Sequence, residues 1–177
     1  MFFILRSFGI SPKGKPRTTE RPSQQATLTI TSSAFDDYGM IPTRYTCEGE
    51  NVSPPLEITN IPEEARSLAL IMHDSDAPVP GGWTHWILFN IKVGAKVTIQ
   101  ERRIPEGAIE GFTSFGAQGY GGPCPLSGTH HYEFRLYALD SELSLSGNAK
   151  KHDLEHAMEG HVLAVSVLIG LYKKKDS

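Results

Sequence analysis

Cysteine is scarce in this sequence, long apolar runs are absent, and basic residues are not in excess. Two cysteines among 177 residues are too few for a disulfide-rich scaffold. No apolar run approaches the roughly 20 residues that a membrane-spanning helix requires. With a net charge of −3, the chain lacks the basic stripe of a nucleic-acid-binding face, so we expect no nucleic acid partner. Hydrophobic and charged fractions of 39% and 21% are typical of one soluble globular domain.

Charge is unevenly distributed along the chain. The first 25 residues carry five Arg or Lys and one Glu, whereas residues 26–177 carry 12 Arg or Lys and 19 Asp or Glu. The apolar start MFFILRSFGI is similar to a signal peptide, but Arg6 interrupts it and no small-residue cleavage site follows cleanly. We predict a flexible basic leader at 1–25, one domain at 26–174 and a tail at 175–177, in a cytoplasmic protein. Cys47 and Cys124 are then expected to be reduced thiols, with one disulfide left open.

Apolar runs and alternation predict a mostly β protein. The run SLALIMHD is nearly continuous, which is typical of a buried central strand. Several strands joined by long loops, with one or two short helices, indicate an antiparallel β-sandwich with Greek-key connections. The strands are expected at 26–31, 67–74, 83–91, 95–101, 130–139 and in the run HVLAVSVLIGLYKKK, with one short helix at 153–161 and loops at 36–57 and 111–128.

Strict alternation assigns the side chains of these strands to faces. His131 should point away from Tyr132 and lie on the surface. His73 should point away from Asp74 and have a structural role, and Trp86 is expected in the core. In the strand at 83–91, alternation puts Trp83, His85, Ile87 and Phe89 on one face and Thr84, Trp86, Leu88 and Asn90 on the other.

Chemically interesting side chains gather at predicted strand ends. Asp74 and Asp76 end one strand, the next begins with Trp83 and His85, and a third begins near His130 and Tyr132, directly after a glycine-rich loop. If these ends meet at one edge of the sheet, they form a small pocket of aromatics, carboxylates and imidazoles. The aromatic residues Phe112, Phe115 and Tyr120 of the glycine-rich loop indicate that it is ordered and folds back on the body.

Several motifs, in order, resemble the phosphatidylethanolamine-binding protein family, also called the Raf kinase inhibitor-like family, in its bacterial and archaeal branch. They are IPTRYTCEGENVSPPL, DSDAP followed by WTHW, YGGPCPLSGTHHYEFRLYAL and LEHAMEGHVLAVSVLIGLY, and the likeness covers roughly residues 27–172. The resemblance implies a β-sandwich with a small anion-binding pocket at one end. It implies the ligand-binding residues Asp74, Asp76, Trp83, His85, Gly122, Pro123, His130 and Tyr132.

Three positions depart from the pattern of that family. Ser75 and Leu126 stand where the family often has Pro, and His131 stands where it often has Arg. Losing an Arg near the mouth of the pocket weakens the long-range attraction of anions, so the departure bears on affinity more than on the identity of the site.

Carboxylates beside an anion need an explanation, because a bare carboxylate facing a bare phosphate is strongly unfavourable at low dielectric. Two arrangements avoid this. In one, imidazole and backbone N–H groups take the phosphate of a zwitterionic head group, and an aspartate takes its ammonium. In the other, an aspartate accepts from one nitrogen of a histidine and leaves the other nitrogen as a donor.

The most favoured function is a non-enzymatic binding protein without catalytic residues, metal or cofactor, whose ligand is phosphate, a phosphorylated small molecule or a phospholipid head group. The resemblance also implies an alternative, an inhibitor or regulator of a serine protease or protein kinase that acts through a protein surface. Two less favoured readings are a zinc or manganese site on the Asp and His residues and a Cys/His hydrolase with Cys124 as its nucleophile. The oligomeric state stays open, with a dimer among the options.

Overall fold

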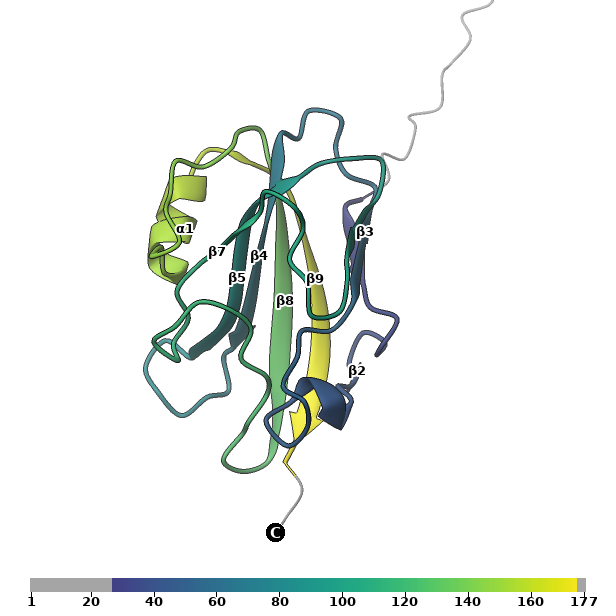
Figure 1. The fold of residues 1–177 in the computed structure, drawn as a ribbon, viewed down its shortest axis with the longest axis vertical. Helices are drawn as coiled ribbons and strands as arrows, with labels where there is room; N and C mark the ends of the chain where they lie inside the picture. Colours follow the sequence, from purple (N-terminus) through teal and green to yellow (C-terminus); the bar gives the residue numbers. More distant parts are fainter. Residues whose placement is uncertain (1–26, 175–177) are drawn as a thin grey trace, which may run out of the picture.

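The computed structural model describes residues 27–174, so the predicted leader at 1–25 and tail at 175–177 lie outside the described residues. Two β-sheets form the body, and the elements are shown in Figure 1. The strands are β1 (Thr29–Thr31), β2 (Gly39–Met40), β3 (Leu56–Thr59), β4 (Ser67–Asp74), β5 (Trp83–Lys92), β6 (Val97–Ile99), β7 (Ile109–Glu110), β8 (Thr129–Leu139) and β9 (Val162–Lys173); the helices are the 3₁₀ turn η1 (Thr43–Tyr45) and α1 (Lys151–Met158).

The predicted β-sandwich is confirmed. A small sheet of order β1-β3-β6 packs on a large sheet of order β2-β9-β8-β4-β5-β7. All pairings are antiparallel except that of β2 with β9. Within the large sheet, β4, β5 and β7 are successive neighbours, and β8 returns to lie beside β4, which is the Greek-key order.

The large sheet is covered on both faces, and this explains the continuous apolar run of β4. Figure 1 shows α1 on one side of the large sheet and β3 on the other. Leu70 and Met72 pack into an inner core between the two sheets, whereas Ile71 packs into an outer core with Leu154 and Met158 of α1. All eight residues of β4 are buried as a result. No helix among residues 27–174 is long and apolar enough to cross a membrane.

The predicted alternation of β5 is broken twice, by an irregularity between Leu88 and Ile91 and by a bulge near the start of the strand. Met72 of β4 lies opposite Trp86, and the next residue, His73, lies opposite Thr84, so His85 is an extra residue in a β-bulge. The bulge separates the side chains that strict alternation puts on one face. Ile87 and Phe89 lie in the outer core, whereas Trp83 and His85 line a cavity at the end of the sandwich. The core position expected for Trp86 is confirmed, because this side chain is 1% exposed.

Most predicted strands occur close to their predicted bounds, and the short elements account for the differences. The segment predicted as a loop at 36–57 contains β2, η1 and the start of β3, and β7 was not expected. The helix starts earlier than predicted, at Lys151, and the Lys150 N–H donates to the Asp153 carboxylate at 2.9 Å. Such a bond satisfies one of the free N–H groups at a helix start.

The expectation of two reduced thiols is wrong, because Cys47 and Cys124 form a disulfide. Their Cα atoms lie 5.4 Å apart although 77 residues separate them in the chain. Folding brings the segment after η1 beside the glycine-rich loop, where the Cys47 N–H also donates to the Pro123 carbonyl at 3.1 Å. A count of two cysteines carries no information on such proximity, which is why the sequence alone favoured free thiols.

Replacing both cysteines by serine is expected to lower the free energy of unfolding by about 4 kcal/mol, because the crosslink closes a long loop in the unfolded chain. Urea unfolding of the double variant and of the unreduced protein measures the difference. Thiol titration of the unreduced protein in denaturant should find no free thiol. Two reactive thiols per chain under those conditions would contradict the pairing.

Candidate functional site

Three strand ends meet at one end of the sandwich, as the sequence predicts. Asp74, the last residue of β4, lies opposite Trp83, the first residue of β5, and opposite Tyr132 near the start of β8. Because both pairings are antiparallel, the end of β4 and the starts of β5 and β8 are brought to the same edge. They lie at the lower end of the molecule in Figure 1.

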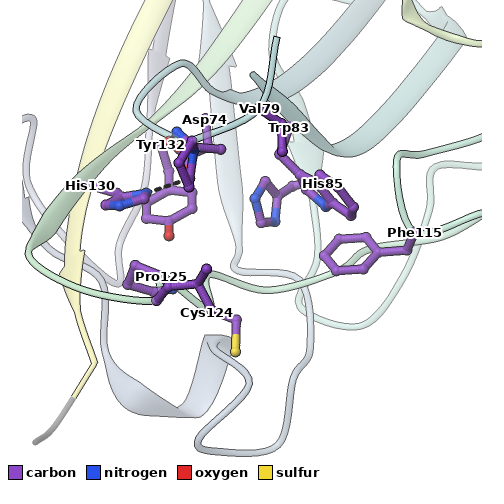
Figure 2. A pocket seen from close by; sticks show the side chains of 12 residues that line it. Asp74, Val79, Trp83, His85, Phe115, Cys124, Pro125, His130 and Tyr132 are labelled. Carbon is purple, nitrogen blue, oxygen red and sulfur yellow. Dashed lines mark hydrogen bonds and ion pairs between the residues drawn. The ribbon is translucent and has the colours of Figure 1, made fainter. Parts of the chain in front are cut away.

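A cavity of about 250 Å³ opens at this edge. Five of the eight predicted residues line it: Asp74, Trp83, His85, His130 and Tyr132. Figure 2 shows the rings of His85, His130 and Tyr132 around its centre, with Cys124 and Pro125 forming the opposite wall. The remaining lining is mostly apolar and comes from loops: Ala77, Pro78 and Val79 after β4, Phe115 in the glycine-rich loop, and Cys124, Pro125 and Leu126 before β8.

The Asp74 carboxylate is buried and has its hydrogen-bonding capacity used by the protein. It is 3% exposed. Its Oδ1 accepts from the N–H groups of Asp76 and Ala77 at 2.9 and 3.1 Å, and its Oδ2 accepts from His130 Nδ1 at 2.7 Å. A buried carboxylate requires such partners. Asp74 therefore shapes the loop after β4 and orients the His130 ring, rather than presenting an unpaired oxygen to a ligand.

Both pocket histidines have their Nδ1 atoms committed as donors. His130 Nδ1 donates to the carboxylate of Asp74, and His85 Nδ1 donates to the carbonyl of Gly121 at 2.6 Å. In the neutral ring the other nitrogen, Nε2, is therefore an acceptor, and it becomes a donor only when the ring is protonated. From the sequence, an aspartate bound to one histidine nitrogen was expected to leave the other nitrogen as a donor. For His130 this holds only when the ring is protonated.

Burial lowers the pKa of His85, and the backbone carbonyl of Gly121 and the charge of Asp74 act in the opposite direction. His85 is 3% exposed, and its ring packs edge-on against the rings of Tyr132 and Phe115, at centroid distances of 5.1 and 5.3 Å. His85 is therefore neutral in the empty pocket at neutral pH, with its Nε2 lone pair available.

Tyr132 carries a buried hydroxyl without a hydrogen-bond partner. In Figure 2 this hydroxyl points towards the wall formed by Cys124 and Pro125. Burial, and secondarily the charge of Asp74, raises the pKa of Tyr132, while the backbone amide of Cys124 acts in the opposite direction. The hydroxyl is therefore a neutral donor, and a buried donor without a partner is costly. A ligand oxygen in the cavity would supply the missing acceptor.

The other three predicted residues do not line the cavity. Asp76 is exposed, and its Oδ2 accepts from both the backbone N–H and Nδ1 of His131, at 2.8 and 2.7 Å. These hydrogen bonds lower the pKa of Asp76. His131 lies on the surface as predicted, at the position where the resemblance suggests Arg, and its visible role is to hold Asp76 outside the pocket.

Gly122 and Pro123 lie behind the pocket wall. The Gly122 N–H donates to Asn51 Oδ1 at 2.7 Å. A Cβ atom on Gly122 would lie 2.4 Å from the carbonyl oxygen of Tyr45, which no side chain tolerates, so the close approach of these two segments requires glycine here. Both residues position the wall that Cys124 and Pro125 present to the cavity.

Sequence reasoning expected Pro78 and Pro125 at the rim of the pocket, but it assigned no lining role to Val79, Phe115 and Leu126. The ring of Phe115 packs edge-on against that of Trp83 at a centroid distance of 5.4 Å. The prediction that the glycine-rich loop folds back on the body was the signal that could have placed Phe115 at the pocket. Val79 belongs to none of the quoted motifs, and Pro125 and Leu126 lie within YGGPCPLSGTHHYEFRLYAL; the place of all three depends on how the loops close over the edge. His73 has the expected structural setting, because it is buried and its Nδ1 pairs with Thr84 Oγ1 at 3.2 Å.

Residues 27–174 contain no group of three or more His, Cys, Asp or Glu side chains arranged to hold a metal ion. His152 and His156 stack one turn apart on α1, with ring centroids at 6.5 Å, and they do not belong to the pocket.

Comparison with known proteins gives a consistent answer. The family model described as "Phosphatidylethanolamine-binding protein" matches residues 31–173. The chain belongs to this family. A relative from Methanothermobacter thermautotrophicus, named only as a UPF0098 protein, is 50% identical over 151 residues, which are 83% of this chain and 99% of the relative.

Solved structures support the same family and the same fold. A phosphatidylethanolamine-binding protein homologue from Chlamydia trachomatis is 38% identical, with a TM-score of 0.79 over 84% of this chain and 99% of its own. A member from Escherichia coli, described as belonging to the mammalian family, is 28% identical, with a TM-score of 0.79 over 85% of this chain and 100% of its own. The resemblance seen in the motifs is thereby confirmed.

The lowered pKa of His85 makes a prediction for the empty protein. NMR titration of its ring should give a midpoint below about 6.5, the ordinary histidine value. Burial also lowers the pKa of His73, so the midpoint of its titration should lie below the ordinary value as well. Because the unfolded chain binds these protons first, the histidine contribution to stability is complete above about pH 6.5 and is lost as the pH falls towards the folded midpoints. A His85 midpoint at or above 6.5 would contradict the burial of a neutral ring.

Proposed function

We propose that the pocket binds a small anionic group, such as phosphate, the phosphate of a small molecule or a phospholipid head group, without catalysing a reaction. The hydroxyl of Tyr132 carries the proposal, because it is a buried donor beside the cavity that has no hydrogen-bond acceptor among the described residues. The backbone N–H of Cys124 acts as a donor towards the Tyr132 oxygen, so the hydroxyl proton is left for another acceptor. His85 and His130 face them from the other strands.

The charges of the lining indicate what accompanies the anion. Among residues 27–174, no Lys or Arg lines the cavity, and the one carboxylate in the lining is that of Asp74. An unpaired anion buried beside that charge would be unfavourable. Since the free Nε2 atoms are acceptors in neutral rings, they can contact an anion only through a proton. This proton comes either from solvent onto a ring or from the ligand itself, as in a singly protonated phosphate. The pocket therefore favours an anion that binds together with a proton.

The apolar lining indicates that the ligand carries more than a bare anion. Val79, Phe115 and Leu126 are exposed large hydrophobic residues at the pocket, with 41%, 49% and 87% exposure. A phosphodiester has one negative charge and apolar substituents that such a rim accommodates. The phosphatidylethanolamine in the description of the matching family has a head group of this kind.

Hydrolysis by a Cys/His pair is not supported. The Sγ atom of Cys124 is bonded to Cys47, so the oxidised protein has no thiolate at this position. The ammonium role expected for an aspartate is not supported for Asp74, whose two oxygens accept three hydrogen bonds from the protein.

Anion affinity should rise as the pH falls. If one ring takes up a proton on binding, the association constant increases by up to about tenfold per pH unit above the ring pKa, following proton linkage. Calorimetry with dimethyl phosphate from pH 8 to 5.5 tests this, since this phosphodiester keeps one charge throughout. Titrations in buffers of different ionisation heats count the protons taken up. Equal affinity at both ends of the range would sink the proton-coupled mechanism.

His85→Ala should weaken binding of O-phosphoethanolamine by about tenfold to a hundredfold, since a hydrogen bond to a charged group contributes about 1.5–3 kcal/mol. The matched control is His131→Ala, which removes an exposed imidazole that pairs with Asp76 outside the cavity. Both titrations are done in EDTA, and circular dichroism checks folding. If the two variants lose equal affinity, the ligand does not bind in the pocket. If binding requires added zinc, a metal site is favoured instead.

A further inference from the structure

We propose that the Cys47–Cys124 disulfide is a redox-sensitive clamp on the anion pocket, so that its reduction by a dithiol weakens anion binding. The inference rests on the proposed function. It concerns the regulation of that site, and it begins from the position of Cys124 in the wall of the cavity.

The disulfide joins the pocket wall to a separate part of the fold. Cys47 follows η1, which Glu101 holds to the body through hydrogen bonds from Arg44 and Tyr45 at 2.6 and 3.0 Å. Cys124 lies between Pro123 and Pro125, directly opposite the Tyr132 hydroxyl in Figure 2. The crosslink therefore determines how far the wall stands from the donors on β8.

Few other interactions hold this wall. The hydrogen bonds that tie the loop to the η1 side end at Pro123, with Gly122 donating to Asn51 and Cys47 donating to the Pro123 carbonyl. From Pro125 to Gly128, no hydrogen bond links the loop to the other described residues. Leu126 is 87% exposed, so packing adds little there. Beyond Pro123, the disulfide at Cys124 and the packing of the buried Pro125 restrain the loop until β8 begins.

The bond is accessible to a reductant, because both cysteines are exposed residues. A thiolate of an external dithiol attacks one sulfur, the S–S bond breaks, and a mixed disulfide forms. The second thiol of the reductant then displaces the protein sulfur. Two electrons pass to the protein, which gains two protons and ends with two thiols, and the dithiol ends as a disulfide.

Loss of the crosslink frees the segment that supplies Cys124 and Pro125 to the cavity. The Cys124 amide then leaves its place beside Tyr132, and the wall no longer covers the anion. A pocket that forms only part of the time binds more weakly in proportion to the fraction formed. We expect at least tenfold weaker binding in the reduced protein.

The test is calorimetric titration of O-phosphoethanolamine into the oxidised protein and into protein held in excess dithiothreitol. The Cys47→Ser/Cys124→Ser variant should bind as weakly as the reduced protein and should not respond to dithiothreitol. If the oxidised protein binds and the reduced protein binds equally well, the clamp is overturned and the proposed function stays intact. An oxidised protein that does not bind would instead overturn the proposed function.

A control separates the clamp from a general loss of stability. Leu154→Ala removes a buried side chain of α1 from the outer core, away from the pocket. It should lower stability while leaving affinity and its sensitivity to dithiothreitol unchanged. Hydrogen exchange in the reduced wild type should increase in residues 122–128 and stay unchanged in β4. Affinity lost equally in Leu154→Ala, or exchange raised equally in both segments, would overturn the clamp.

Reciprocity provides a second measurement that needs no variant. If oxidation raises affinity tenfold, saturating ligand must favour the disulfide over the dithiol by the same factor. For a two-electron couple this lowers the reduction potential by about 30 mV. Equilibration in dithiothreitol redox buffers with and without saturating O-phosphoethanolamine measures the shift, and identical midpoints would contradict the proposal.

Discussion

The buried carboxylate of Asp74 is the interaction on which the end of this sandwich depends. It joins three segments at once, since it ends β4, receives two N–H groups of the following loop and holds the first imidazole of β8. Without a partner for each oxygen, a charge at 3% exposure would be strongly unfavourable. The loop and the histidine are therefore arranged by what the carboxylate needs. The cavity is the space that remains between them and the disulfide-bound wall.

Under the proposed function, this arrangement lets the pocket receive an anion although no Lys or Arg among the described residues lines it. The carboxylate oxygens accept three hydrogen bonds from the protein, so they are turned to those donors rather than to the cavity. The donors directed at the cavity are a hydroxyl and rings that can take up a proton, and none is a permanent cation. Long-range attraction is weak as a consequence, and discrimination depends on contact at short range, through hydrogen bonds and the apolar rim.

Sequence reasoning recovered the long elements and the composition of the site, and it failed where local geometry decides. The runs that became β4 and β8 were predicted to within one residue because burial on both faces and alternation dominate there. Asp74, Trp83, His85, His130 and Tyr132 were correctly expected together, because antiparallel pairing brings their strand ends to one edge. Asp76 was expected in the pocket, but its neighbour His131 holds it outside, a contact between side chains that no spacing reveals. The disulfide escaped prediction for the same reason.

The bulge at His85 separates two tasks that share a single strand. Side chains after it belong to the repetitive packing of a sheet interior, where volume and shape restrict substitution. Trp83 and His85 instead line the cavity, and the extra residue lets them do so beside the pairing of β5 with β4. The two ends of β5 are therefore under different physical constraints, which are contacts at the cavity for one end and core packing for the other.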